Sequence, residues 1–195
     1  MFDELVKELK KNNIVLEEGK INKLEEYWNL LLQYNKSMHL FSRKLQEHEL
    51  KKQFYDVILL DVFLPDYDEL VDAGSGAGFV GLILGILNPE RRYVLVERSV
   101  KKGDFLQIAA FKLKLENIAV LKQDIREFER EADVVVSKAS CMRNLLERRL
   151  TKILRVGGML VHFSSSPLSS PYKNYPYRNP FRNNNSYIAV LKRVI

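Results

Sequence analysis

Residues 72–79 read Asp-Ala-Gly-Ser-Gly-Ala-Gly-Phe, and they join a short β-rich run, Glu69–Ala73, to a nine-residue apolar run, Phe79–Leu87. Glycines let the backbone turn tightly and approach a ligand closely. A glycine-rich turn between a strand and a helix is typical of a doubly wound parallel sheet, which binds its ligand at the carboxyl ends of the strands. The segment therefore predicts an α/β fold with a ligand site at this turn.

The sequence on the carboxyl side of the turn alternates β-rich and helical stretches. We expect strands at Glu69–Ala73, Tyr93–Glu97, Ile118–Leu121, Asp133–Ser137 and Met159–Phe163. We expect helices at Gly78–Leu87, Val100–Leu113 and Met142–Leu154, with Gly157-Gly158 ending the last of them, as glycine commonly does. This order predicts repeated βαβ units and a parallel sheet.

The two ends of the chain differ from this pattern. Apolar residues at helical spacing, such as Phe2, Leu5, Val6 and Leu9, predict three helices before Pro65. We therefore divide the chain into a helical N-terminal extension, 1–65, and a sheet-containing core, 66–195. Ser164–Ser186 is rich in Ser, Pro and Asn and predicts a long loop, and Ser186–Val194 predicts a returning antiparallel edge strand.

Composition excludes several classes of protein. Hydrophobic residues make up 46% and charged residues 29% of the 195 positions, which is typical of a globular chain and not of a disordered one. The longest apolar run is far shorter than the roughly 20 residues of a membrane span, so we expect a cytoplasmic protein. A single cysteine, Cys141, excludes intrachain disulfides, and three scattered histidines suggest no metal site.

Charge is distributed unevenly along the chain. The net charge is +6, yet the last acidic residue is Glu147, and nine Lys and Arg residues follow it. Near the end, Tyr172-Lys173, Tyr177-Arg178 and Phe181-Arg182 place aromatic rings beside cations. Single-stranded RNA is commonly bound by stacking together with neutralisation of phosphates. This region therefore predicts contact with a polyanion.

The glycine turn is compatible with two nucleoside cofactors. Gly76, Gly78 and Gly81 match the spacing of a dinucleotide-binding turn. Glu97, at the end of the second expected strand, suits the ribose hydroxyls of either nicotinamide or S-adenosylmethionine (SAM). Asp72 favours SAM, because a carboxylate there attracts a cationic amino-acid group and repels a pyrophosphate. A nicotinamide-dependent oxidoreductase stays open as the alternative.

An ordered set of motifs resembles the RsmG (GidB) family of SAM-dependent methyltransferases, which act on N7 of a guanine in 16S rRNA of the small ribosomal subunit. The resemblance runs from about Ile21 to Phe163 and rests on these motifs: Tyr34-Asn35-Lys36, Asp72 to Gly81, Pro89, Lys101-Lys102, Phe105-Leu106, Leu113 to Ile118 and Ser137-Lys138-Ala139. It implies a Rossmann-like class I SAM-dependent methyltransferase sheet with a helical N-terminal extension.

The resemblance also implies roles for individual residues. SAM would be bound by Asp72, Gly74, Ser75, Gly76, Gly78 and Phe79 in the turn, by Glu97 at the ribose, and by Asp124 and Ile125 near the adenine. We assign the guanine contact at O6 or the adjoining phosphate to Lys138, the one catalytic candidate. RNA contacts are assigned to Lys138, Arg143, Arg178 and Arg182.

The substrate side departs from the family pattern. His39-Leu40-Phe41 stands where the family has Asn-Leu-Thr, Gln53 where it has His, and Lys138 where it has Arg. Guanine N7 is a lone pair that attacks a methyl group without losing a proton, so no general base is expected. We expect a monomer that acts on rRNA. The departures keep open a second alternative, a non-catalytic RNA-binding or assembly protein on a methyltransferase scaffold.

Overall fold

The structure is a computed structural model that describes residues 2–41, 47–138 and 144–194. The described residues form a seven-stranded sheet in the order β3-β2-β1-β4-β5-β7-β6. Its strands are β1 (Glu69–Ala73), β2 (Arg92–Val96), β3 (Ile118–Leu121), β4 (Ala132–Ser137), β5 (Leu154–Ser164), β6 (Lys173–Tyr177) and β7 (Ser186–Lys192). Strands β1 to β5 are parallel, and β7 is antiparallel to both of its neighbours.

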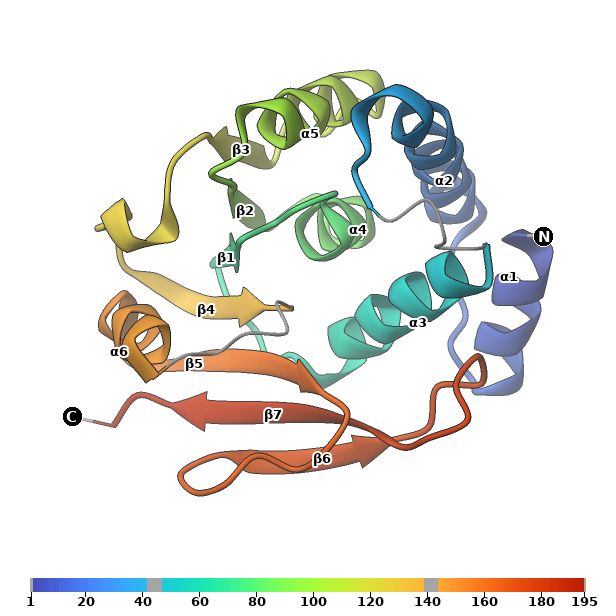
Figure 1. The fold of residues 1–195 in the computed structure, drawn as a ribbon. Helices are drawn as coiled ribbons and strands as arrows, with labels where there is room; N and C mark the ends of the chain where they lie inside the picture. Colours follow the sequence, from blue (N-terminus) through green and yellow to red (C-terminus); the bar gives the residue numbers. More distant parts are fainter. Residues whose placement is uncertain (1, 42–46, 139–143, 195) are drawn as a thin grey trace.

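Helices cover both faces of the curved sheet (Figure 1). The helices are α1 (Phe2–Lys11), α2 (Glu18–Met38), α3 (Glu47–Phe63), α4 (Phe79–Leu87), α5 (Val100–Lys112) and α6 (Asn144–Lys152), with a short 3-10 helix, η1 (Ile125–Glu127). Helices α1 to α5 lie on the concave face, where they share one hydrophobic core with the sheet. Helix α6 and Phe128 pack on the opposite face in a second core.

The sequence explains why α4 is central to the concave face. All but the first of its nine residues are buried, which is typical of a helix surrounded by protein on all sides. Gly81 allows the close approach to β2, because a Cβ at this position would lie 2.4 Å from Leu95 Cδ1. Strand β1 and helix α4 are thus packed firmly, and the turn between them is fixed at both ends.

The predicted doubly wound sheet is confirmed. Strands β1 and β3 have the predicted bounds, and the other predicted helices and strands of the parallel part recur with shifts of one or two residues at their ends, except that β5 begins five residues before the predicted Met159. The three predicted N-terminal helices are present as α1, α2 and α3. The domain division at residue 65 stays a prediction, although buried residues of these helices and of the sheet belong to one cluster.

The prediction that Gly157-Gly158 ends a helix is wrong. Helix α6 ends at Lys152, and β5 begins at Leu154 and runs through both glycines. Its register against β4 shifts between Ala132 and Val134. Gly157 has φ of +83°, and a Cβ on Gly158 would lie 2.8 Å from the Asp133 carbonyl oxygen. Both glycines are therefore required by an irregularity within a strand, a common position for strand glycines.

The predicted loop at Ser164–Ser186 contains a strand, and the predicted edge strand is internal. Strand β6 pairs with β7 and forms the edge of the sheet, so β7 lies between β5 and β6. Pro176 lies within β6. Proline lacks an N–H group but is tolerated on an edge strand, so the prolines that suggested a loop are compatible with this strand.

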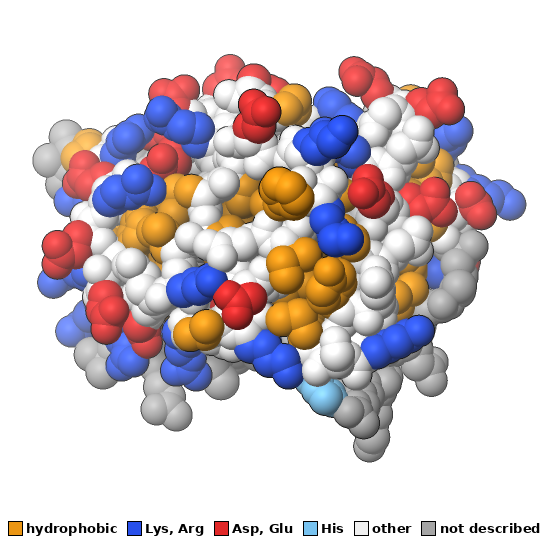
Figure 2. Space-filling model, turned by 90° about the horizontal axis from the view of Figure 1, so that it is seen from above, with side chains coloured by type: hydrophobic (Ala, Val, Ile, Leu, Met, Phe, Trp, Pro, Cys, Tyr) orange, Lys and Arg blue, Asp and Glu red, His pale blue; other side chains and the backbone are white. Residues whose placement is uncertain are grey.

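Figure 2 shows the face seen from above α2 and α5, on which Lys and Arg side chains are mixed with Asp and Glu. On the described residues of this face no broad region carries charge of a single sign. None of the described helices is long and apolar enough to cross a bilayer.

Candidate active site

The glycine turn joins β1 to α4 at the carboxyl edge of the parallel strands. Gly74, Gly76 and Gly78 have φ of +76°, +58° and +88°, values that favour glycine because other residues carry a Cβ. The Gly74 and Ser75 amides donate to the Val96 carbonyl at 2.9 and 3.1 Å, which fastens the turn to the end of β2. The residue types read from the sequence therefore match the backbone that this turn requires.

Asp72 lies under the turn at the end of β1. Its side chain is buried, and Oδ2 accepts a hydrogen bond from the Gly81 amide at 3.0 Å. Burial raises the pKa of Asp72 to about 7, and the hydrogen bonds from Gly81 and Ser75 oppose that rise only in part. A cationic ligand group would favour the ionised carboxylate. The residue thus fits an ammonium ion better than a phosphate.

Glu97 follows β2 and contacts the same turn. Its carboxylate accepts hydrogen bonds from the Gly76 amide and from the Ser99 amide, each at 2.8 Å. A carboxylate offers about four lone-pair sites, so two acceptor positions are left for the hydroxyls of a ribose. The sequence indicated the ribose role, whereas the hydrogen bond that shapes the turn is visible only in the folded chain.

The residues after β3 stand beside Glu97, because the Glu97 amide donates to the Leu121 carbonyl at 3.0 Å. The Asp124 side chain accepts hydrogen bonds from the backbone amide and the guanidinium of Arg126, at 2.7 to 3.0 Å. These bonds lower the pKa of Asp124 to about 2. Asp124 is therefore paired within η1, and the half-buried Ile125 is the apolar surface available to an adenine.

Phe79, the first residue of α4, is half-buried and packs against aromatic rings of the N-terminal region. Its centroid lies 6.2 Å from that of Phe41 and 6.3 Å from that of Phe54. Phe41 is itself partly exposed, and its amide donates to Asn35 Oδ1 at 3.0 Å. The segment in which this sequence departs from the family pattern thus lies against the glycine turn.

Tyr27 is a residue of this site that the sequence did not reveal. Its hydroxyl donates to the Ala77 carbonyl at 2.8 Å from helix α2, and the side chain is fully buried. In the sequence Tyr27 is only one member of an amphipathic helix, so nothing there distinguishes its hydroxyl from a solvated one. Helix α2 therefore supports the glycine turn directly.

Lys138 follows β4 and points toward helix α3. Its Nζ donates to the Gln53 carbonyl at 3.3 Å, lies 3.6 Å from Asp56 Oδ2, and is 4.8 Å from the centroid of the Phe163 ring. Burial lowers the pKa of Lys138 to about 8, against the opposing effect of Asp56. Only 16% of its side chain is exposed. The ammonium is thus held at the sheet edge by protein groups.

The three arginines assigned to RNA have different surroundings. Arg143 lies outside the described residues. Arg178 is exposed and lines a groove formed with α3 and the segment before α2. Arg182 donates to Asp56 Oδ2 at 2.8 Å and to Ser186 Oγ at 3.2 Å. Arg182 is therefore partly exposed and paired with the buried Asp56, whereas Arg178 is accessible to a phosphate.

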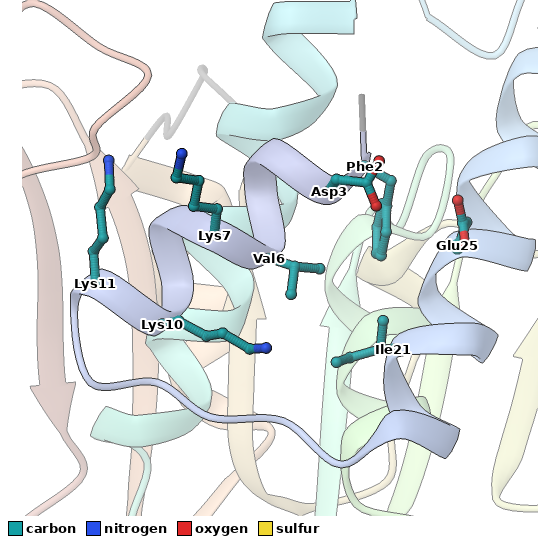
Figure 3. Close-up of a pocket in the computed structure, with 8 residues that line it drawn as sticks. All are labelled: Phe2, Asp3, Val6, Lys7, Lys10, Lys11, Ile21 and Glu25. Atoms are coloured by element: carbon teal, nitrogen blue, oxygen red, sulfur yellow. The ribbon is translucent and has the colours of Figure 1, made fainter.

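A separate hollow of about 630 Å³ lies between α1 and α2. Figure 3 shows Val6 and Ile21 on the two facing helices, and Lys7 and Lys11 extending away from them on the other side of α1. The lining includes no residue of the glycine turn. This hollow is therefore distinct from the glycine turn. Among the described residues, no group of three or more His, Cys, Asp or Glu side chains could hold a metal ion.

Comparison with known proteins identifies the family. The model of GidB, described as rRNA small subunit methyltransferase G, matches residues 20–174. The chain belongs to this family.

Relatives named ribosomal RNA small subunit methyltransferase G match much of this chain, as two examples show. The one from Brachyspira hyodysenteriae is 35% identical over 66% of this chain and 63% of its own length. The one from Fusobacterium nucleatum is 29% identical over 98% of this chain and 91% of its own length. The resemblance inferred from the motifs is confirmed.

Solved structures support the fold class. TYW2 of M. jannaschii, solved with AdoMet, has a TM-score of 0.57 at 13% identity, and the match covers 78% of this chain and 76% of the TYW2 chain. NodS of Bradyrhizobium japonicum, an N-methyltransferase solved with S-adenosylhomocysteine, has a TM-score of 0.56 at 14% identity and covers 85% and 98%. The chain has the class I SAM-dependent methyltransferase fold. With the family match, this makes SAM its cofactor and rejects the nicotinamide alternative.

Proposed function

We propose that this family member transfers the methyl group of SAM to N7 of a guanine in 16S rRNA, as a cytoplasmic monomer that needs no metal ion. The observation that carries the proposal is the buried Asp72 carboxylate beneath three glycines in left-handed conformations. It provides an acceptor for an ammonium group at the place where a doubly wound sheet binds its ligand.

The residues of the turn fit SAM group by group. Asp72 suits the ammonium of the methionine part, and the glycine backbone leaves room for close approach. Glu97 retains acceptor positions for the ribose hydroxyls, and Ile125 offers an apolar contact to the adenine. When bound, SAM supplies a methyl group on a sulfonium ion, which is electrophilic without further activation.

The protein's part in the reaction is positioning. Guanine N7 attacks with an in-plane lone pair and loses no proton, so no general base is required. Guanine presents O6 and N7 as neighbouring acceptors, and a donor on N7 would block the attack. Lys138, at the carboxyl end of β4, suits O6 or the adjoining phosphate, since its ammonium is a donor without an acceptor. Alignment of N7 with the methyl group and sulfur is then the main contribution to the rate.

The exposed cation Arg178, which follows β6, supports an RNA substrate. Cations that contact phosphates release counterions on binding. The C-terminal excess of basic residues has the sign that such a substrate requires.

Two measurements test the proposal. N7-methylguanine is mapped in rRNA from cells with and without the protein, and one position is expected to lose its methyl group. Purified protein is then incubated with labelled SAM and either 30S subunits or naked rRNA. Label in RNA supports catalysis, whereas RNA binding without label would support the non-catalytic assembly protein.

A further inference from the structure

Asp56 of helix α3 is a fully buried carboxylate that the cofactor site does not use. In the sequence it is the one charged residue between Phe54 and Leu60, a stretch that is otherwise apolar. A charge in such a position is costly unless cationic and hydrogen-bonding groups surround it. The groups that surround Asp56 therefore indicate why helix α3 carries a carboxylate at this buried position.

Four donors from two distant parts of the chain converge on Asp56. Oδ1 accepts from the Tyr177 hydroxyl and from Asn179 Nδ2, each at 2.7 Å. Oδ2 accepts from Arg182 Nη2 at 2.8 Å and lies 3.6 Å from Lys138 Nζ. The carboxylate thus links α3 to the end of β4 and to the segment that joins β6 to β7.

We propose that Asp56 is a positioning residue for methyl transfer, whose carboxylate fixes the Lys138 ammonium at the carboxyl end of β4 and anchors residues 177–182 against α3. This inference rests on the proposed contact between Lys138 and the RNA substrate. The inference goes beyond that contact by naming the residue that orients the Lys138 side chain.

The surroundings of Lys138 explain why an orienting group is needed. A lysine side chain has a flexible four-carbon stem and a point charge, so it does not fix its own direction. Asp56 from α3, together with the Gln53 carbonyl and the Phe163 ring, restricts the ammonium to one position.

The charges that face Lys138 come from three elements. Asp56 on α3 and Asp72 on β1 raise its pKa, whereas Arg182 and burial lower it. The pKa of Lys138 is about 8 as a result. Removing Asp56 should therefore lower this pKa, and removing Arg182 should raise it. A carboxylate whose contacts all lay away from Lys138 would produce no such shift.

The first test is the Asp56→Asn variant in the full-length protein, with 30S subunits or rRNA at subsaturating concentration. Under this condition the pH profile reports groups of the free enzyme. We expect the alkaline decline in methylation to begin at least about one pH unit lower than in wild type, because Lys138 loses the neighbouring negative charge that favours its protonated form. One pKa unit corresponds to about a tenfold change in the protonation equilibrium of Lys138. At pH 6, where Lys138 keeps its proton, the rate should still be lower than that of wild type, because the ammonium is no longer held in one position; the Kd for SAM should change by less than about threefold.

Asp61→Asn is the matched control, because Asp61 is a half-buried carboxylate on the same helix that accepts a hydrogen bond from Asn88. Its alkaline decline should coincide with that of wild type. An Asp56→Asn profile that keeps the wild-type pH dependence, or loses activity equally at every pH, overturns the proposal.

Arg182→Gln provides an independent test if Asp56→Asn does not fold. It removes the cation that lowers the pKa of Lys138, so the alkaline decline should move to higher pH, opposite to the effect of Asp56→Asn. No movement, or movement to lower pH, overturns the proposal.

Lys138→Met separates this proposal from the one on which it rests. If Lys138→Met methylates RNA at the wild-type rate, the substrate role of Lys138 is wrong and the role of Asp56 fails with it. If Lys138→Met is slow and Asp56→Asn behaves like Asp61→Asn, only the role of Asp56 is overturned.

Discussion

The Tyr27 hydroxyl donates a hydrogen bond of 2.8 Å to the Ala77 carbonyl, and both groups are buried. This bond connects helix α2 of the N-terminal region to the turn that fits SAM. The helices before β1 therefore do more than cover the sheet, because one of them holds the backbone of the proposed cofactor site.

Replacing Tyr27 with Phe should weaken both the fold and the cofactor site. The change leaves the buried Ala77 carbonyl without its partner, which typically costs about 1 to 3 kcal/mol. We expect a lower free energy of unfolding by denaturant and a higher Kd for SAM by calorimetry. Tyr34→Phe, on the same helix with a ring that packs against Phe105, is the control. Equal stability of the two variants would contradict the role of the Tyr27 hydroxyl.

Gly76→Val should abolish SAM binding. Gly76 has φ of +58°, and a β-branched side chain is strained in this conformation and would project at the turn. Gly19→Ala in helix α2 is the matched control, because no atom lies within 4 Å of the added Cβ. Calorimetric titration with SAM measures both. Binding by Gly76→Val with unchanged affinity would show that the turn is not the cofactor site.

Lys138→Met should slow methyl transfer and leave SAM affinity nearly unchanged, because the proposed contact of Lys138 is with RNA. Single-turnover transfer from labelled SAM measures the rate, and calorimetry measures cofactor affinity. Lys112→Met, at the exposed end of α5, serves as the control. A loss of SAM affinity with an unchanged rate at saturating SAM would reverse the assignment.

SAM binding should weaken as the pH falls through about 7. The pKa of Asp72 is raised to about 7 by burial, so the carboxyl is ionised above that pH and neutral below it. A neutral carboxyl loses its attraction for an ammonium group, and Kd should rise by up to about tenfold per pH unit. Calorimetry between pH 5.5 and 8.5 measures the trend. Asp72→Asn should bind weakly with no such trend, and a flat wild-type profile would contradict the assignment.

Asp72 also affects the stability of the protein without ligand. Here a rise in pH is unfavourable, whereas it favours SAM binding. The pKa of Asp72 in the folded protein exceeds its ordinary value of 3.8. Between about pH 4 and pH 7 the unfolded chain therefore binds fewer protons at this position than the folded protein does. The contribution of Asp72 to the free energy of unfolding should fall as pH rises through this window. The free energies of unfolding of wild type and Asp72→Asn are measured by urea denaturation across this pH window. The difference between them isolates the contribution of Asp72.

Arg178 and Arg182 should respond differently to substitution by Ala. Arg178 is exposed, so Arg178→Ala should leave the melting temperature unchanged and reduce the salt dependence of RNA binding by about one phosphate contact. Arg182 is paired with the buried Asp56, so Arg182→Ala leaves one Asp56 oxygen without this donor and should destabilise the fold by about 1 to 3 kcal/mol. Binding titrations at several salt concentrations and thermal melts separate the two effects. A reduced salt slope for Arg182→Ala alone would contradict this division.

The sequence predicted the parallel part of the sheet correctly because its strands, turns and helices are each specified by residues that are close together in the chain. Residues 69–87 contain a β-rich run, a glycine turn and a buried helix in immediate succession, and each is specified by residues next to one another. The predictions for Gly157-Gly158 and for Ser164–Ser186 were wrong for the converse reason. Glycine and proline disfavour regular structure locally, but a strand irregularity and a sheet edge accept them once a neighbouring strand is present.

The sequence by itself determined the glycine turn, the carboxylates on either side of it and the family motifs, because these residues are close in the chain and act through the backbone conformation they permit. Only the tertiary structure decided that Tyr27 supports the turn and that Asp56 joins Lys138 to Arg182, since each pair of partners lies at least 50 residues apart in the chain. A buried polar group must have a hydrogen-bonding partner, but its position in the sequence does not identify that partner. The fold supplies that partner by packing α2, α3 and the C-terminal strands around the end of the sheet.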